Sequence, residues 1–282
     1  MDAEQDVESN RATRMKTAIL LGTAFYVWVA TSATAAHASP CDHPDNVQFV
    51  TGGNECLLIR TARGSAATTG GPLFILLHGD FSHEAVLSEN YFNKAKQLTE
   101  LAPSATAIAM ARPGYQAPSG LGSTGESYGH HDNETAENID DIAGAIQTLR
   151  AIYHPSKVVL IGHSGGAQVA AIILARHPHL ADAAVLVSGP FDVAAWKAAH
   201  NISGPFRSES PIRYVDRIPP DTRIVVIEGT SDTNTFPALA EQYTAALKAR
   251  GVPVQLIEVP GADHDAAFNA PAVYSSALQL AK

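Results

Sequence analysis

From Leu73 to Lys282, short continuous apolar runs alternate with longer segments rich in helix-forming residues. The apolar runs are typical of strands that are buried on both faces of a sheet. This alternation predicts a mostly parallel sheet covered by helices on both faces, the arrangement of an α/β fold. The expected strands are residues 72–77, 105–111, 157–161, 183–188, 223–229 and 253–260, and the expected helices are residues 83–101, 134–152, 167–176 and 236–251.

Two further strands are predicted ahead of this region, at residues 46–51 and 57–60. The Gly-Gly-Asn sequence at residues 52–54 favours a tight turn between them, so we expect an N-terminal antiparallel hairpin. The only two cysteines of the chain, Cys41 and Cys56, flank the first of these strands. A disulfide between them would hold the hairpin and contribute roughly 3 kcal/mol of stability. Two buried free thiols are the alternative.

The first part of the chain has the composition of a secretory signal peptide. Residues 11–16 are basic, residues 18–30 are apolar, and residues 36–38 (Ala-His-Ala) form a small-x-small cleavage site before Ser39. We therefore expect residues 1–38 to be removed and the protein to be secreted or periplasmic. An oxidising compartment agrees with the expected disulfide.

Two points about this segment stay open. Met15 is an alternative start, because the preceding residues are acidic and unlike a basic n-region. The apolar stretch could instead remain as an uncleaved anchor, although it is short for a membrane span of ~20 residues. No other membrane contact is predicted. Residues 39–282 are expected to form one α/β domain.

Composition narrows the choice of partners. The formal net charge is −9, and no run of Lys and Arg is present that could contact phosphates, so a nucleic-acid partner is not expected.

Between two predicted strands, residues 190–222 leave room for a small helical cap but not for a second domain. Trp196 and Phe206 in this cap either line a substrate pocket or pack the cap onto the body, and packing is the favoured reading for Trp196.

The sequence Gly162-His163-Ser164-Gly165-Gly166 has the form G-x-S-x-G and lies between a predicted strand and a predicted helix. A serine on such a strand–turn–helix is held in strained backbone angles, and the flanking glycines let strand and helix pass close together. Ser164 is therefore the candidate nucleophile. An ordinary helix N-cap serine is the alternative.

A serine hydroxyl is a weak nucleophile and needs a base that is oriented by a third group. His264 follows the last predicted strand, and Asp232 follows the strand before it. Because the carboxyl ends of parallel strands meet at one edge of a sheet, we expect both residues to converge on Ser164, with His264 as general base and acid and Asp232 as its orienting carboxylate. Asp192 is the rival acid. Asp263 and Asp265 are expected to be solvated or turn-forming carboxylates.

The third requirement is a pair of donors for the oxyanion that forms during acyl transfer. The N–H of Gly165, the residue after the nucleophile, is the first candidate. The second is the N–H of Asp80 or of Phe81, since the strand at 72–77 runs into His78-Gly79-Asp80-Phe81. Sequence does not decide between the two. His78 is expected to be a structural hydrogen-bonding residue rather than a base.

A metal site at Gly129-His130-His131-Asp132 is not expected. Adjacent residues of an extended chain point apart, and no helical His-x-x-x-His pair supports them. No cofactor is implied.

Together these motifs resemble the α/β-hydrolase superfamily, and the C-terminal part resembles the catalytic domain of its prolyl-oligopeptidase-like branch, which is related to dienelactone hydrolases and esterases. The resemblance covers about residues 70–282. It implies an α/β-hydrolase fold and hydrolysis through an acyl-enzyme. The matching stretches are residues 162–166, 210–218, 228–232, 236–251 and 260–264.

The large peptidases of this branch carry a propeller domain built from repeats, and no repeats precede the hydrolase-like region in this chain. We therefore expect a small-molecule carboxylic ester as substrate. A short peptide, cleaved by an aminopeptidase or oligopeptidase, is the alternative. A non-catalytic binding protein on the same fold is a third reading, which a complete Ser-Asp-His set disfavours.

Overall fold

The structure is a computed structural model, and it describes residues 44–80, 88–130 and 132–282. Three groups of expectations lie outside these ranges: the targeting segment with Cys41, the oxyanion candidate Phe81, and His131 of the His-His-Asp run. Cys56 is described and lies buried in a strand, but its pairing with Cys41 stays a prediction. In the ranges described, no helix is long and apolar enough to cross a membrane.

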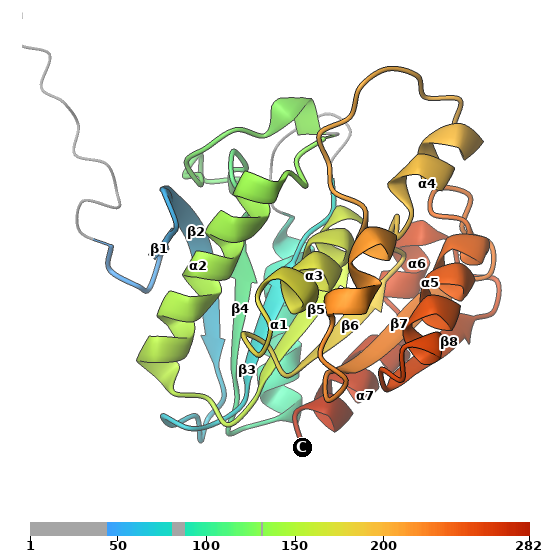
Figure 1. Cartoon of the computed structure of the whole chain (residues 1–282). Coiled ribbons are helices and arrows are strands. Elements are labelled where there is room, and N and C mark those ends of the chain that lie inside the picture. Colours follow the sequence, from blue (N-terminus) through green and yellow to red (C-terminus); the bar gives the residue numbers. More distant parts are fainter. Residues whose placement is uncertain (1–43, 81–87, 131) are drawn as a thin grey trace, which may run out of the picture. The chain divides into compact units, whose positions relative to one another are not determined.

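The centre of the fold is a sheet, with eight strands in the described residues, in the order β1-β2-β4-β3-β5-β6-β7-β8 (Figure 1). β1 and β2 form the expected antiparallel hairpin, and β2 also pairs antiparallel with β4. From β4 across to β8 every pairing is parallel. The strands are β1 (Phe49–Gly52), β2 (Glu55–Arg63), β3 (Leu73–Leu77), β4 (Thr106–Met110), β5 (Val158–His163), β6 (Ala183–Val187), β7 (Arg223–Gly229) and β8 (Val254–Val259).

Helices cover both faces of the sheet, and each face has its own apolar core (Figure 1). Successive side chains of a strand point to opposite faces, so Leu160 of β5 joins one core and Ile161 joins the other. This double burial explains why the central strands are continuous apolar runs. The first core contains α2 (Ala136–Tyr153), α3 (Gly165–Arg176) and α5 (Pro237–Ala249), and the second contains α1 (Glu89–Leu101), α6 (His264–Phe268) and α7 (Pro271–Leu280).

The predicted fold class is confirmed, with differences at the level of single elements. The expected cap lies between β6 and β7. It contains a short helix, α4 (Val193–Ala199), and a 3-10 helix, η2 (Pro211–Arg217). His264, expected directly after the last strand, is the first residue of the short helix α6. Only five residues long, α6 is too short to leave a helical pattern in the sequence.

Candidate active site

The turn between β5 and α3 places Ser164 in a backbone conformation that few residues adopt, with φ 54° and ψ −123°. Close packing of β5 against α3 requires glycine two residues earlier, at position 162. A Cβ on Gly162 would lie 2.3 Å from the carbonyl oxygen of Gly166. The Ser164 side chain makes no capping hydrogen bond to α3. The N-cap alternative is thus not what the structure shows, and the hydroxyl is available for chemistry.

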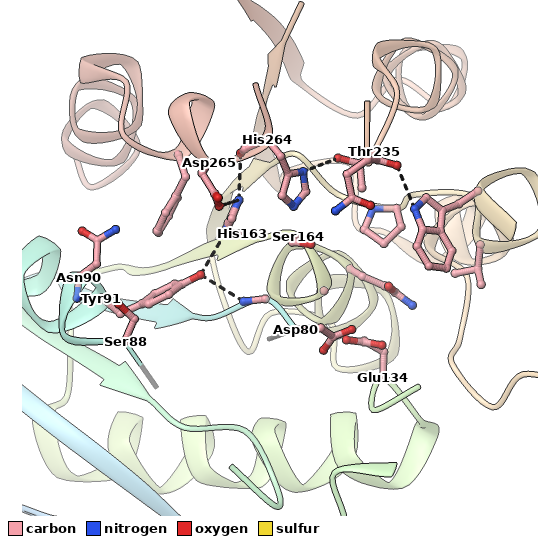
Figure 2. Close-up of a pocket in the computed structure, with 18 of the residues that line it drawn as sticks. Asp80, Ser88, Asn90, Tyr91, Glu134, His163, Ser164, Thr235, His264 and Asp265 are labelled. Carbon is pink, nitrogen blue, oxygen red and sulfur yellow. Dashed lines mark hydrogen bonds and ion pairs between the residues drawn. The ribbon is translucent and has the colours of Figure 1, made fainter. Parts of the chain in front are cut away.

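Ser164 lines a cavity of about 670 Å³ at the carboxyl ends of the parallel strands. His264 lines the same cavity, and Figure 2 shows its ring beside Thr235, on the side toward Ser164. Gly79 and Gly165 bring the two backbone segments expected to stabilise an oxyanion into the cavity wall. A Cβ on Gly79 would lie 2.7 Å from Cβ of Ser164, so only glycine allows this approach.

His264 and Asp232 are joined by a hydrogen bond of 2.8 Å between Nδ1 and Oδ2. The carboxylate accepts, so Nδ1 carries the proton and Nε2 keeps its lone pair. Thr235 supports the pair: its N–H donates to Asp232 Oδ1, and its hydroxyl lies 2.9 Å from Asp232 Oδ2. Burial alone would raise the pKa of Asp232, but the hydrogen bond and charge of His264 and the N–H groups of Thr235 and Asn234 hold it well below its usual value.

A second carboxyl, Glu228, lies behind this pair at the end of β7. It is 1 % exposed, and its Oε1 accepts from the Ser188 hydroxyl at 3.3 Å and from the Gly229 N–H at 3.1 Å. Its other oxygen is buried and has no hydrogen-bond partner in the described residues. Burial and the charge of Asp232 raise the pKa of Glu228 to about 9, so this side chain is neutral at pH 7. Only one of the two neighbouring carboxyls is charged.

A chain of hydrogen bonds connects the loop after β3 with α1, the end of β5 and the start of α6 (Figure 2). The Gly79 N–H donates to the Tyr91 hydroxyl (3.2 Å), which lies 3.1 Å from His163 Nδ1, and His163 Nε2 lies 3.1 Å from the His264 carbonyl oxygen. A carbonyl only accepts, so Nε2 of His163 carries the proton and Nδ1 accepts from Tyr91. Burial and the nearby His264 lower the pKa of His163 to about 3, which keeps it neutral.

The loop after β3 is fixed by a buried arginine. Arg112, fully buried, pairs with Asp80 on one side and with Glu134 on the other. Tyr115 donates to the same Asp80 oxygen at 2.9 Å. Both carboxylates line the cavity, and Figure 2 shows them side by side below Ser164. Burial and the charge of Asp80 raise the pKa of Glu134. Because the buried Arg112 and Tyr115 both bind the Asp80 carboxylate, they hold the loop that carries Asp80 at the edge of the cavity.

Three further expectations concern residues near the site. His78 is fully buried; its Nδ1–H donates to the Gly79 carbonyl at 2.7 Å and its Nε2 accepts from the Arg112 N–H at 3.0 Å, which is the structural role expected of it. Asp192, the rival acid, caps α4 by accepting from two backbone N–H groups. Asp263 likewise caps α6, whereas Asp265 lines the cavity with an exposed side chain.

The cap contributes an aromatic wall. Trp196 and Phe206 both line the cavity, and the Trp196 indole N–H also donates to the Asn234 carbonyl at 3.0 Å. Trp196 therefore both anchors the cap through this hydrogen bond and lines the cavity, so the two alternatives considered for it are not exclusive. In the described residues no cluster of three side chains could hold a metal ion, and Asp132 instead accepts from the N–H groups of Arg207 and Ser208.

Sequence reasoning missed several of these residues. Arg112 directly follows an expected strand, so its place at the site edge could have been inferred from the strand-end rule. Thr235 lies in the same turn as Asp232 and could have been considered as a partner. Tyr91 and Glu134 are distant from the motifs, and no local pattern marks them.

The strand order, the elbow at Ser164 and the cavity at the strand ends define an α/β-hydrolase of the serine hydrolase type. A model of the prolyl oligopeptidase family matches residues 115–281. The chain belongs to this family.

Comparisons with individual proteins include both esterases and peptidases. A probable glutamyl endopeptidase from rice, Oryza sativa subsp. japonica, is 30% identical over 131 residues, which are 41% of this chain and 13% of that protein. The ferulic acid-bound structure of Est1E from Butyrivibrio proteoclasticus has a TM-score of 0.64 at 13% identity and covers 82% of this chain and 98% of its own. The acylaminoacyl peptidase of Pyrococcus horikoshii has a TM-score of 0.61 at 12% identity and covers 80% and 38%. These two structural similarities show the fold alone.

The neutral state of Glu228 can be tested through stability. A carboxyl whose pKa is higher in the folded than in the unfolded chain binds more protons when folded, so stability falls as pH rises from about 4.5 to about 9. Glu228→Gln removes this contribution. The free energy of unfolding is measured by urea titration at each pH from 5 to 8. We expect it to fall with rising pH less steeply in the variant than in the wild type, and the two slopes should differ by up to ~1.4 kcal/mol per pH unit. Glu258→Gln, at the exposed register partner on β8, should keep the wild-type slope; an unchanged slope in Glu228→Gln would show that Glu228 is ionised.

The role of Tyr91 can be tested by Tyr91→Phe, which keeps the ring and removes the hydroxyl. The buried Gly79 N–H and His163 Nδ1 would lose this partner, so we expect a loss of about 1–3 kcal/mol in the free energy of unfolding. Tyr243→Phe is the matched control, because the buried Tyr243 hydroxyl has no hydrogen-bond partner in the described part of the chain. Denaturant unfolding of both variants should show no loss for Tyr243→Phe. Equal losses in the two variants would contradict the hydrogen-bond chain.

Proposed function

We propose that this protein cleaves carboxylic esters through an acyl-enzyme, with Ser164 as nucleophile, His264 as general base and acid, and Asp232 as the orienting carboxylate. The observation that carries the proposal is the 2.8 Å hydrogen bond between His264 and Asp232 beside the uncapped Ser164 hydroxyl. It leaves Nε2 of His264 as the proton acceptor in the cavity that Ser164 lines.

The reaction follows from these positions. Ser164 Oγ attacks the ester carbonyl carbon while His264 Nε2 takes its proton, and the carbonyl oxygen becomes an oxyanion. Protonated His264 then gives the proton to the leaving alkoxide as the C–O bond breaks, which leaves an acyl-serine. Water attacks the acyl carbon with His264 again as base, and release of the acid restores Ser164. Asp232 stabilises the imidazolium in both halves.

The proposed oxyanion donors are the N–H groups of Gly165 and Asp80. Gly165 is the first residue of α3, where backbone N–H groups lack acceptors within the helix and the helix dipole favours negative charge. Asp80 lines the cavity and is held by Arg112. Phe81, the other candidate for the second donor, lies outside the described residues.

Two observations support an ester substrate. The solved structures with this fold include Est1E with ferulic acid bound. The cavity also has an aromatic wall of Trp196 and Phe206, suited to the apolar or aromatic part of a small ester. A short-peptide substrate is the second candidate, and membership of the prolyl oligopeptidase family favours it.

Export to an oxidising compartment is the remaining part of the proposal. It is supported by the basic and apolar segments at residues 11–30 and by the small residues before Ser39. The intact mass of the protein recovered from its source, with and without reduction, tests both cleavage after Ala38 and the Cys41–Cys56 disulfide.

Activity tests the catalytic assignment directly. The chain from Ser39 is assayed on p-nitrophenyl esters of increasing acyl length and on aminoacyl and prolyl anilides. We expect ester turnover that falls roughly 10⁴-fold or more in Ser164→Ala and in Asp232→Asn, because the nucleophile or the orientation of its base is lost. Asp192→Asn, at the rival acid that caps α4, should retain turnover of the wild-type order.

Each result separates the candidates. Cleavage of anilides in preference to esters would assign a peptidase. A collapse in Asp192→Asn rather than in Asp232→Asn would overturn the choice of acid. If neither substrate class is cleaved and a fluorophosphonate does not label Ser164, the chain is not a serine hydrolase in function.

A further inference from the structure

A second cavity, of about 390 Å³, lies between α1 and α7 next to the active-site cavity. Asn90 and Asn269 line both cavities, and their side-chain amides approach each other to 3.5 Å. A molecule bound at Ser164 and extending past these two residues would enter the second cavity. The mechanism proposed above uses none of the groups that are specific to it.

The cavity contains a buried cation that pairs with no carboxylate among the described residues. Lys94 of α1 is only 4 % exposed, yet no ion pair joins it to a carboxylate in the described part of the chain. Its ammonium lies 3.4 Å from the Tyr274 hydroxyl and 4.5 Å above the Phe268 ring. Burial lowers the pKa of Lys94 to about 8, which leaves it mostly protonated at pH 7. Removing an ammonium from water without a paired anion costs several kcal/mol.

A helix N-terminus adds a second positive contribution at the same place. The cavity is lined by Asn269, Pro271 and Tyr274, which belong to the start of α7 or directly precede it. The N-cap residue is Ala270, whose side chain accepts no hydrogen bond. The positive end of the α7 dipole is therefore not compensated by a capping oxygen, and an anion there would be stabilised.

The other lining groups are neutral donors. Asn90, Asn93 and Gln97 of α1 line the cavity with Lys94, and each side-chain amide offers N–H groups. One ammonium, amide donors and a helix N-terminus match a singly charged planar anion. Among the lining residues that the structure describes there is no arginine, the residue that binds a doubly charged phosphate bidentately.

We propose that the cavity between α1 and α7 binds a carboxylate group through Lys94 and the N-terminus of α7. In a substrate, this carboxylate is carried on the part that extends from Ser164 past Asn90 and Asn269, a placement that rests on the esterase function proposed above. The same chemistry also fits a free carboxylate that binds beside the active site. The experiment below separates the two sources.

The first arm measures turnover of p-nitrophenyl half-esters of succinate, glutarate, adipate and suberate, each beside the methyl-terminated ester of the same chain length. The readout is the ratio of kcat/KM for the charged ester to kcat/KM for its neutral partner. Lys94→Met keeps the length of the side chain and removes the charge. We expect the ratio for at least one chain length to fall about tenfold in this variant, the equivalent of one lost charge-assisted contact. Lys96→Met, at an exposed position of the same helix, should keep the wild-type ratio.

The second arm does not depend on catalysis. Binding of free glutarate to the Ser164→Ala protein is measured by calorimetry at constant ionic strength and repeated in the Lys94→Met and Lys96→Met backgrounds. Heat of binding that disappears only with Lys94→Met supports the site, and with unchanged ester ratios it assigns the ligand as a free carboxylate. Because a methionine fits the apolar stem, both variants are first compared by thermal unfolding. Lys94→Gln replaces Lys94→Met if the latter does not fold.

The outcomes are distinct. If the wild type cleaves none of the esters but binds glutarate in a way that depends on Lys94, the esterase function is rejected and the carboxylate site is kept. Ester turnover with ratios that are the same in wild type and both variants, and no Lys94-dependent binding of glutarate, would overturn the carboxylate site and keep the esterase function.

Discussion

The site depends on the backbone conformation of Ser164. A non-glycine residue at φ 54° and ψ −123° costs about 1–3 kcal/mol, which the surrounding structure must offset. Its N–H donates to Val187 of β6 at 2.9 Å, and its carbonyl accepts from Ala167 in the first turn of α3 at 2.9 Å. The buried strand and the buried helix therefore hold the turn from both sides. The same geometry that strains the backbone keeps the hydroxyl away from the helix cap and in the cavity.

Around this serine the protein limits the number of free charges. His163, Tyr91 and Glu228 are titratable and buried, and burial shifts each pKa in the direction that keeps the group neutral. Neutral groups join the loops by hydrogen bonds without the desolvation cost of an ion. Asp232 stays ionised among them because His264, Thr235 and Asn234 donate to its oxygens. Of the two neighbouring carboxyls Asp232 and Glu228, the one that faces the imidazole therefore carries the negative charge.

Residues at strand ends could be placed from the sequence because a parallel sheet brings those ends to one edge. That rule was sufficient for Ser164, His264 and Asp232, although they are far apart along the chain. It did not identify Tyr91, which approaches from the side of a helix, because the register of α1 against the sheet is set by packing rather than by a local pattern. For the same reason the sequence could not show that Glu134 meets Arg112, since their contact depends on how the irregular segment before α2 folds back.

A buried cation lies at each of the two cavities, and the two cations differ in whether they pair with a carboxylate. Arg112 is fully buried and pairs with two carboxylates, so its presence is explained by the loop that it holds. Lys94 is almost as well buried, and among the residues that the structure describes its ammonium contacts aromatic rings and a hydroxyl, which recover a small part of the hydration that an ammonium loses. An apolar residue of similar length would pack against Phe268 and Tyr274 without that cost. The carboxylate proposed for this cavity would offset that cost, and the uncapped start of α7, which lines the same cavity, would favour it as well.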